Sequence, residues 1–182
     1  MTSLNYIGKR LRKKDGREKV TGRAIYGQDL VLPRMLCGKI LYSPYPHAKI
    51  RSIDTGRAKR VPGVRAILTG DDIPDIRIGF IKDNTPINKG VVRWAGDEVA
   101  AVAAESEEAA EEAIGLIEVD YEELPAVFTP EDALSEEAPI LHEGRKSNRI
   151  DEICRTYRKG DIEEGFAKSD IVLEETYQLQ HM

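Results

Sequence analysis

The sequence predicts an α+β fold, because apolar patterns of strand period alternate with capped helical patterns along its 182 residues. The clearest of them is a strand–helix–strand unit over residues 93–126. Its residues 98–104 are almost uninterruptedly apolar, which is typical of a strand that is covered on both faces. Ser106 then offers a helix N-cap, and Val119 and Tyr121 alternate with acidic residues in a second strand. If those two strands are parallel neighbours, the helix is a right-handed crossover within a mixed sheet.

The chain before this unit is predicted to begin with a basic arm over residues 1–17 and to continue as short strands. The strands are expected at residues 24–26, 35–43, 48–54 and 64–69, with a short helix at 56–60. Ile50 and Ile53 are expected to face inward, because they alternate with basic residues. Residues 75–92 are the least regular section. A loop of this length inside a compact domain is often functional or part of an interface.

The chain after the unit carries two further helix starts and a final strand pattern. Thr129 is followed by a proline and, three residues after the cap, by an acid, which predicts a short helix ending near residues 134–135. Residues 136–158 are polar and irregular, and Asp161 begins a second capping pattern. Alternation over residues 171–180 predicts a long half-buried strand. Since no later segment follows to pair with it, we expect a fragment of a longer polypeptide or an end that docks elsewhere.

Composition and charge favour a soluble globular protein of the cytoplasm. Hydrophobic residues make up 41% and charged residues 32% of the chain. No apolar run approaches the roughly 20 residues of a membrane span, and the N-terminus lacks the apolar core of a secretory signal. Residues 9–19 carry seven basic and two acidic side chains, although the net charge of the chain is −5. No nucleic-acid-binding motif accompanies this arm, so we expect neither nucleic acid nor a membrane as its partner.

The histidines and cysteines do not form a recognised metal site or catalytic site. The three histidines, His47, His142 and His181, make no HxH or HExxH pattern. Cys37 and Cys154 form no CxxC pair, and two cysteines cannot hold an iron–sulfur cluster by themselves. We interpret His47 as a loop residue with a hydrogen-bonding role and Cys37 as a buried small hydrophobic residue.

The acidic residues and the single tryptophan also have structural interpretations. The acidic pairs 71–72, 107–108 and 122–123 lie mostly at turns and helix starts, where capping explains them. The segment 96–98 is interpreted as a tight turn that leads into the apolar strand, with a phosphate-facing turn as the weaker alternative. Trp94 is interpreted as a packing residue, with an exposed partner-binding anchor as the weaker alternative. We therefore predict no catalytic, cofactor-binding or metal-binding residue in this chain.

Six segments of the chain match a known family in order and at its spacing. They are DGREKVTGRAIYGQD (15–29), SPYPHAKIRSID (43–54), VPGVRAILTGDDIP (61–74), RWAGDEVAAVAAES (93–106), IEVDYEELPAVFTPEDAL (117–134) and KGDIEEGFAKSDIVLEETY (159–177). Together they resemble the N-terminal part of the molybdenum-binding large subunit of the xanthine dehydrogenase/aldehyde oxidase family. The nearest resemblance is to prokaryotic split-subunit enzymes, such as the 4-hydroxybenzoyl-CoA reductase, nicotinate dehydrogenase and carbon monoxide dehydrogenase large subunits.

The resemblance implies a domain organisation. Residues 18–127 would form the α+β fold known as the a/b hammerhead domain, preceded by the arm of residues 1–17. Residues 128–182 would be a linker and the truncated start of the molybdopterin-binding domain. In this family the glycine-rich pterin-binding loops and the catalytic glutamate lie downstream of the position that corresponds to residue 182. The chain alone is therefore expected to bind no cofactor and to be inactive.

The resemblance also implies a molybdopterin-dependent oxidoreductase as the holoenzyme. Its molybdenum–pterin centre mainly hydroxylates carbon next to nitrogen or an aldehyde, and [2Fe–2S] clusters pass electrons to FAD or another acceptor. The expected partners are the downstream molybdopterin-binding domain and the iron–sulfur and FAD subunits or domains. The chain would scaffold the active site and the subunit contacts. The alternative is a stand-alone interaction or assembly module without redox activity.

Overall fold

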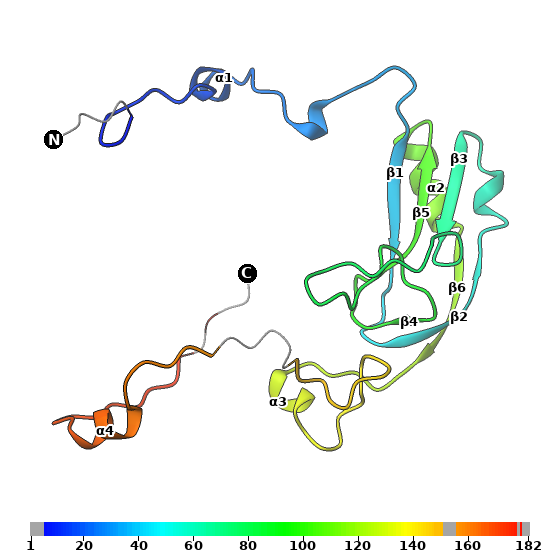
Figure 1. Ribbon diagram of the computed structural model, residues 1–182. Coiled ribbons are helices and arrows are strands. Elements are labelled where there is room, and N and C mark those ends of the chain that lie inside the picture. The colour runs from blue at the N-terminus through cyan, green and yellow to red at the C-terminus, as the bar shows by residue number, and fades with distance from the viewer. Residues whose placement is uncertain (1–5, 151–155, 178, 180–182) are drawn as a thin grey trace. The chain divides into compact units, whose positions relative to one another are not determined.

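The structure is a computed structural model and describes residues 6–150, 156–177 and 179 (Figure 1). The chain divides into two compact units, Met1–Phe128 and Thr129–Met182, and each is described by itself. The first unit holds two three-stranded sheets and one longer helix, which confirms the predicted α+β class.

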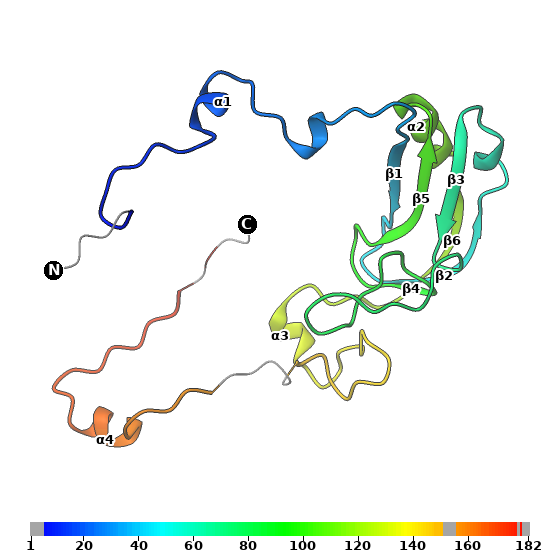
Figure 2. The same ribbon diagram turned by 45° about the horizontal axis from the view of Figure 1, so that its top comes forward.

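Sheet A has the strand order β1 (Cys37–Tyr42), β5 (Glu98–Ala104) and β3 (Val64–Thr69). Both neighbouring pairs are antiparallel. β5 has a hydrogen-bonded neighbour at each edge, but only one of its faces is fully covered. Val99, Ala100, Val102 and Ala104 are buried, whereas Ala101 and Ala103 are partly exposed, so the prediction of a strand covered on both faces is wrong for one face. The helix α2 (Glu107–Gly115) packs against one face of this sheet (Figures 1 and 2).

Sheet B has the strand order β4 (Val91–Val92), β2 (Ala48–Asp54) and β6 (Glu118–Glu123), again with antiparallel pairs only. The predicted mixed sheet is therefore wrong. Because β1 and β3 occupy both edges of β5, no edge is left for β6 to pair with. The helix α2 thus connects one sheet to the other and is not a crossover between parallel neighbours.

The main core lies between α2 and sheet A, and it is built largely from small side chains. Ala100 and Ala104 of β5 and Ala110 and Ala113 of α2 all have 0% exposure. Alanine at these positions lets the helix approach the strand closely. The Ser106 side chain accepts a hydrogen bond of 3.2 Å from the backbone N–H of Ala109, which confirms the predicted N-cap.

Two predicted strands are wrong. Residues 24–26 pair with no strand and lie between the short helices α1 (Gly16–Val20) and η1 (Gly27–Asp29). Residues 171–177 also make no strand; residues 178 and 180 of that prediction lie outside the described residues. Alternation alone cannot form a strand, because the backbone N–H and C=O groups need a neighbour to pair with.

The helical predictions are largely confirmed. The expected helix at 56–60 is the 3₁₀ helix η2 (Ala58–Arg60). In the second unit, Thr129 caps α3 (Pro130–Ala133) and Asp161 caps α4 (Ile162–Ala167), each through a side-chain oxygen that accepts a backbone N–H. None of the helices in the described part of the chain has the length and apolar character that a membrane span requires.

Candidate functional site

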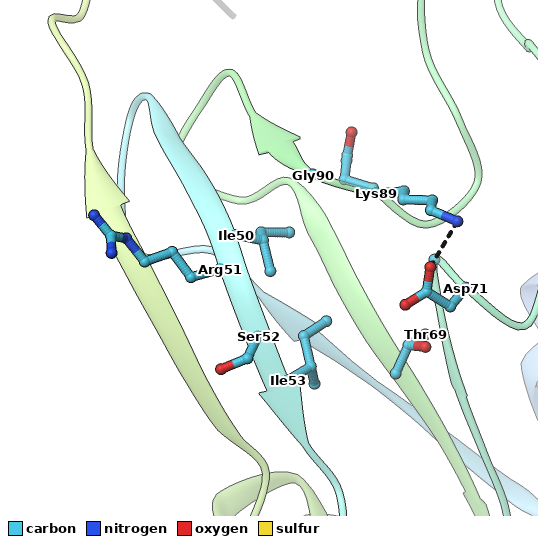
Figure 3. Close-up of a pocket in the computed structure, with 10 residues that line it drawn as sticks. Ile50, Arg51, Ser52, Ile53, Thr69, Asp71, Lys89 and Gly90 are labelled. Atoms are coloured by element: carbon cyan, nitrogen blue, oxygen red, sulfur yellow. Dashed lines mark ion pairs between the residues drawn. The ribbon is translucent and has the colours of Figure 1, made fainter.

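The first unit contains a pocket of about 230 Å³ between strand β2, the turn after β3, and the loop of residues 88–90. In Figure 3, Ile50 and Ile53 point toward the pocket from β2, whereas Arg51 points away from it. On the opposite side, Lys89 Nζ lies 2.6 Å from a carboxylate oxygen of Asp71. The pocket therefore combines an apolar wall with one ion pair.

Local sequence explains the shape of this pocket. The Asp72 carboxylate accepts hydrogen bonds of 2.8 Å from both the backbone N–H and the hydroxyl of Thr69, which closes the turn after β3. These bonds hold the pKa of Asp72 below its ordinary value. At Gly70, a Cβ atom would lie only 2.6 Å from the backbone oxygen of Asn88, so glycine permits the close approach of the two loops.

The pocket does not contain the groups that a self-sufficient catalytic site needs. Asp71 and Lys89 are paired with each other, and both side chains are largely exposed. The Asp71 carboxylate raises the pKa of Lys89, so the amine stays charged rather than acting as a base. Among the described residues, His, Cys, Asp and Glu side chains form no group of three or more that could hold a metal ion.

His47 has the structural role that the sequence predicts. Its side chain is 6% exposed, and its Nδ1 atom lies 2.5 Å from the carbonyl oxygen of Pro125. Its own carbonyl oxygen accepts a 3.0 Å hydrogen bond from the backbone N–H of Leu124. His47 thereby ties the segment that follows β6 to the turn that precedes β2.

Asp97 is a buried acid whose environment the sequence does not reveal. Its side chain has 0% exposure. One carboxylate oxygen accepts a 2.5 Å hydrogen bond from the backbone N–H of Arg93, which fixes the tight turn predicted before β5. The other oxygen has no hydrogen-bond partner among the described residues. Burial raises the pKa of Asp97, and backbone hydrogen bonds from Arg93 and Trp94 oppose that rise.

We expect Asp97→Asn and Asp72→Asn to change the pH dependence of stability with opposite signs. Folding raises the pKa of Asp97, so the free energy of unfolding falls as pH rises from the unfolded-state pKa, about 3.9, through the folded-state value. Asp97→Asn should remove that fall. Folding lowers the pKa of Asp72, so its contribution is lost as pH falls through the folded-state value.

Urea unfolding of the wild type and both variants at several pH values between about 3 and 7 measures this difference. Relative to wild type, Asp97→Asn should gain stability as pH rises, and Asp72→Asn should lose it. The same sign for both variants would contradict the assignment.

Two interpretations of single residues require correction. Trp94 is 44% exposed and is not a packing residue, because it lies in the tight turn before β5 and its side chain points partly into solvent. Cys37 is only partly buried, because it begins β1 at the edge of sheet A. The acids 107–108 lie in the first turn of α2, as predicted, and Glu107 also lies 2.7 Å from Lys39 of β1.

Comparison with known proteins places these features in a family. Residues 21–125 match the family described as aldehyde oxidase and xanthine dehydrogenase, a/b hammerhead domain. The chain is 46% identical over 170 residues to a probable xanthine dehydrogenase subunit of Bacillus subtilis strain 168, covering 92% of this chain and 22% of that protein. It is 37% identical over 181 residues to the nicotinate dehydrogenase large molybdopterin subunit of Eubacterium barkeri, covering 97% of this chain and 42% of that protein.

A solved structure agrees with this assignment. The crystal structure of quinoline 2-oxidoreductase from Pseudomonas putida 86 superimposes with a TM-score of 0.67 at 37% identity, covering 78% of this chain and 19% of that chain. The chain therefore belongs to the aldehyde oxidase and xanthine dehydrogenase family and contains its a/b hammerhead domain. This confirms the resemblance that the sequence predicts. The chain spans less than half the length of these relatives.

Proposed function

We propose that this chain is the N-terminal structural part of the large subunit of a molybdenum hydroxylase. It scaffolds the molybdopterin active site and the subunit contacts and carries no catalytic residue of its own. One observation carries the proposal: the match extends over 92% of this chain but only 22% of a relative whose name describes a part of a xanthine dehydrogenase. The remaining length of such a protein is available for the catalytic machinery.

The residues of the described pocket do not fit a molybdopterin. Its volume of about 230 Å³ is below the roughly 300–1,000 Å³ that is usual for cofactor sites. The two charged groups on the side of the pocket opposite β2, Asp71 and Lys89, neutralise each other. We propose that molybdopterin is held by the molybdopterin-binding domain, whose start lies within residues 128–182, after a hammerhead domain over residues 18–127 and an arm over 1–17. The [2Fe–2S] clusters and FAD belong to other subunits or domains.

Molybdenum analysis tests this proposal. The purified 182-residue chain is expected to contain no molybdenum. The assembly that is purified from the natural host through a tag on this chain is expected to contain close to stoichiometric molybdenum. Elemental analysis of both samples is the measurement. Stoichiometric molybdenum in the isolated chain would place the cofactor site within it, and an assembly without molybdenum would favour the stand-alone interaction module.

A further inference from the structure

One face of sheet A is covered by α2, and the opposite face is open and apolar. The register of the strands places six residues on this open face in two rows of three: Ile40, Ala101 and Leu68, then Gly38, Ala103 and Ala66. Ile40 and Leu68 remain 42% and 44% exposed, and Tyr42 continues the face at 52%. We call these six residues with Tyr42 the open face.

The outer face of sheet B provides an internal comparison. There Lys49 pairs across the strands with Glu122, and Arg51 lies 3.2 Å from the same carboxylate. Such a surface is adapted to water. The two rows of the open face carry no charged side chain, and Glu98, opposite Tyr42, lies at its end. An apolar centre of this kind is typical of a surface that becomes covered in the assembled protein.

The shape of the open face limits what kind of element can pack against it. Four of its seven residues are glycine or alanine: Ala101 lies between Ile40 and Leu68, and Gly38, Ala103 and Ala66 form the whole neighbouring row. Small residues leave a shallow surface that another backbone can approach closely. The complementary element therefore carries bulky apolar side chains and no charge at its centre.

The size of the open face favours a tethered occupant over a second copy. Three strands about 4.8 Å apart and six residues long cover on the order of 300 Å². A stable interface between separate proteins needs about 800 Å² on each partner. A partner that is already held in place by the chain or by other contacts needs less, because its effective concentration is high.

The segment before β1 in the sequence also exposes apolar side chains. Residues 30–36 directly precede β1, and Val31, Leu32 and Leu36 among them are 81%, 54% and 43% exposed. Residues 30–36 and β1 are therefore two consecutive stretches of the chain with exposed apolar side chains.

We propose that the open face is the docking surface for the molybdenum-binding region of the large subunit. This inference rests on the proposed function, which supplies the occupant. The inference adds which surface is covered. The face of sheet A opposite α2 is buried in the assembly, whereas the charged outer face of sheet B stays exposed to water.

Two methionine reporters test which face is buried. Leu68→Met places an oxidisable side chain on the open face, and Lys49→Met places one on the outer face of sheet B. Both replaced side chains are exposed and make no hydrogen bond or ion pair among the described contacts, so both variants should fold. Oxidation of each introduced methionine by dilute peroxide is followed by mass spectrometry, in the isolated chain and in the tagged assembly from the natural host.

Compared with the isolated chain, the assembly is expected to slow oxidation of the methionine at position 68 roughly tenfold or more, because the open face is buried. Oxidation at position 49 is expected to slow less than about twofold, because the outer face of sheet B stays exposed. Leu68→Asp should also lower the molybdenum recovered with the tagged chain by roughly tenfold, because docking would bury an unpaired charge.

An assembly that contains molybdenum but in which position 68 is oxidised as fast as in the isolated chain would overturn this inference and leave the proposed function intact. A wild-type assembly without molybdenum would overturn both. Protection of position 68 in a dimer of the isolated chain would make a second copy the occupant and overturn the inference.

Discussion

Ala100→Asp is expected to unfold a large fraction of the Met1–Phe128 unit, whereas the same substitution at the next residue, Ala101, leaves it folded. Both residues belong to β5, but they point to opposite faces of sheet A. Ala100 has 0% exposure and packs in the core beneath α2. Ala101 lies on the open face between Ile40 and Leu68, where a carboxylate can reach water.

The size of the effect follows from charge burial. An uncompensated charge in a core costs about 3–5 kcal/mol. That is a large part of the roughly 5–15 kcal/mol by which a typical domain is stable. Ala101 is partly exposed, so Ala101→Asp should cost no more than about 1 kcal/mol.

Urea unfolding followed by circular dichroism measures both free energies of unfolding. Because the two variants share the strand, the residue type and the charge change, only the face differs between them. Equal destabilisation would show that the open face is already covered within this chain, and it would contradict the assignment of the two faces.

The elements that the sequence predicts correctly are those that local chemistry determines. The apolar run of β5 and the Ser106 cap depend only on neighbours in the chain. Ile50 and Ile53 both face inward as predicted, but strict alternation would put residues three apart on opposite faces, and the register shift between Ile50 and Ser52 against β6 brings both inward. Helix capping and strand alternation act over a few residues, so their patterns are visible without a structure.

The elements that the sequence does not predict depend on partners far along the chain. The two-residue strand β4 exists only because Val92 pairs with Ala48. Residues 24–26 and 171–177 have suitable patterns, but they make no strand in the described part of the chain. The mixed sheet is wrong for the same reason: strand order is a property of the whole unit, and β5 already has two antiparallel neighbours.

The candidate pocket could not be predicted from the sequence either. The pocket exists because the turn at Gly70 contacts the loop at Asn88. No sequence motif around either residue predicts this contact. The burial of Asp97 likewise results from how the turn before β5 packs in the fold, and the residues next to Asp97 in the sequence do not predict it. The family assignment could be predicted, because it depends on six ordered segments and not on any contact.

Gly70→Ala is expected to destabilise the first unit by about 1–3 kcal/mol, as overpacking of a close contact does. The added Cβ would lie 2.6 Å from the backbone oxygen of Asn88 and 2.9 Å from the Cβ of Lys89. Neither atom is the end of a flexible side chain, so relief requires the loop of residues 88–90 to move. That loop is held by a 2.7 Å hydrogen bond from the Asn88 backbone N–H to the carbonyl oxygen of Glu98 on β5.

Gly115→Ala is the matched control, because a Cβ at Gly115 meets nothing within 4 Å. Gly115 ends α2, where alanine should be neutral or stabilising by up to about 1 kcal/mol. Urea unfolding gives both free energies, and hydrogen exchange at the Asn88 amide reports the loop directly. In Gly70→Ala this amide should exchange faster than in wild type, and in Gly115→Ala at the wild-type rate. Unchanged exchange at Asn88 in Gly70→Ala would mean that the two loops do not meet, and the pocket between them would have to be abandoned.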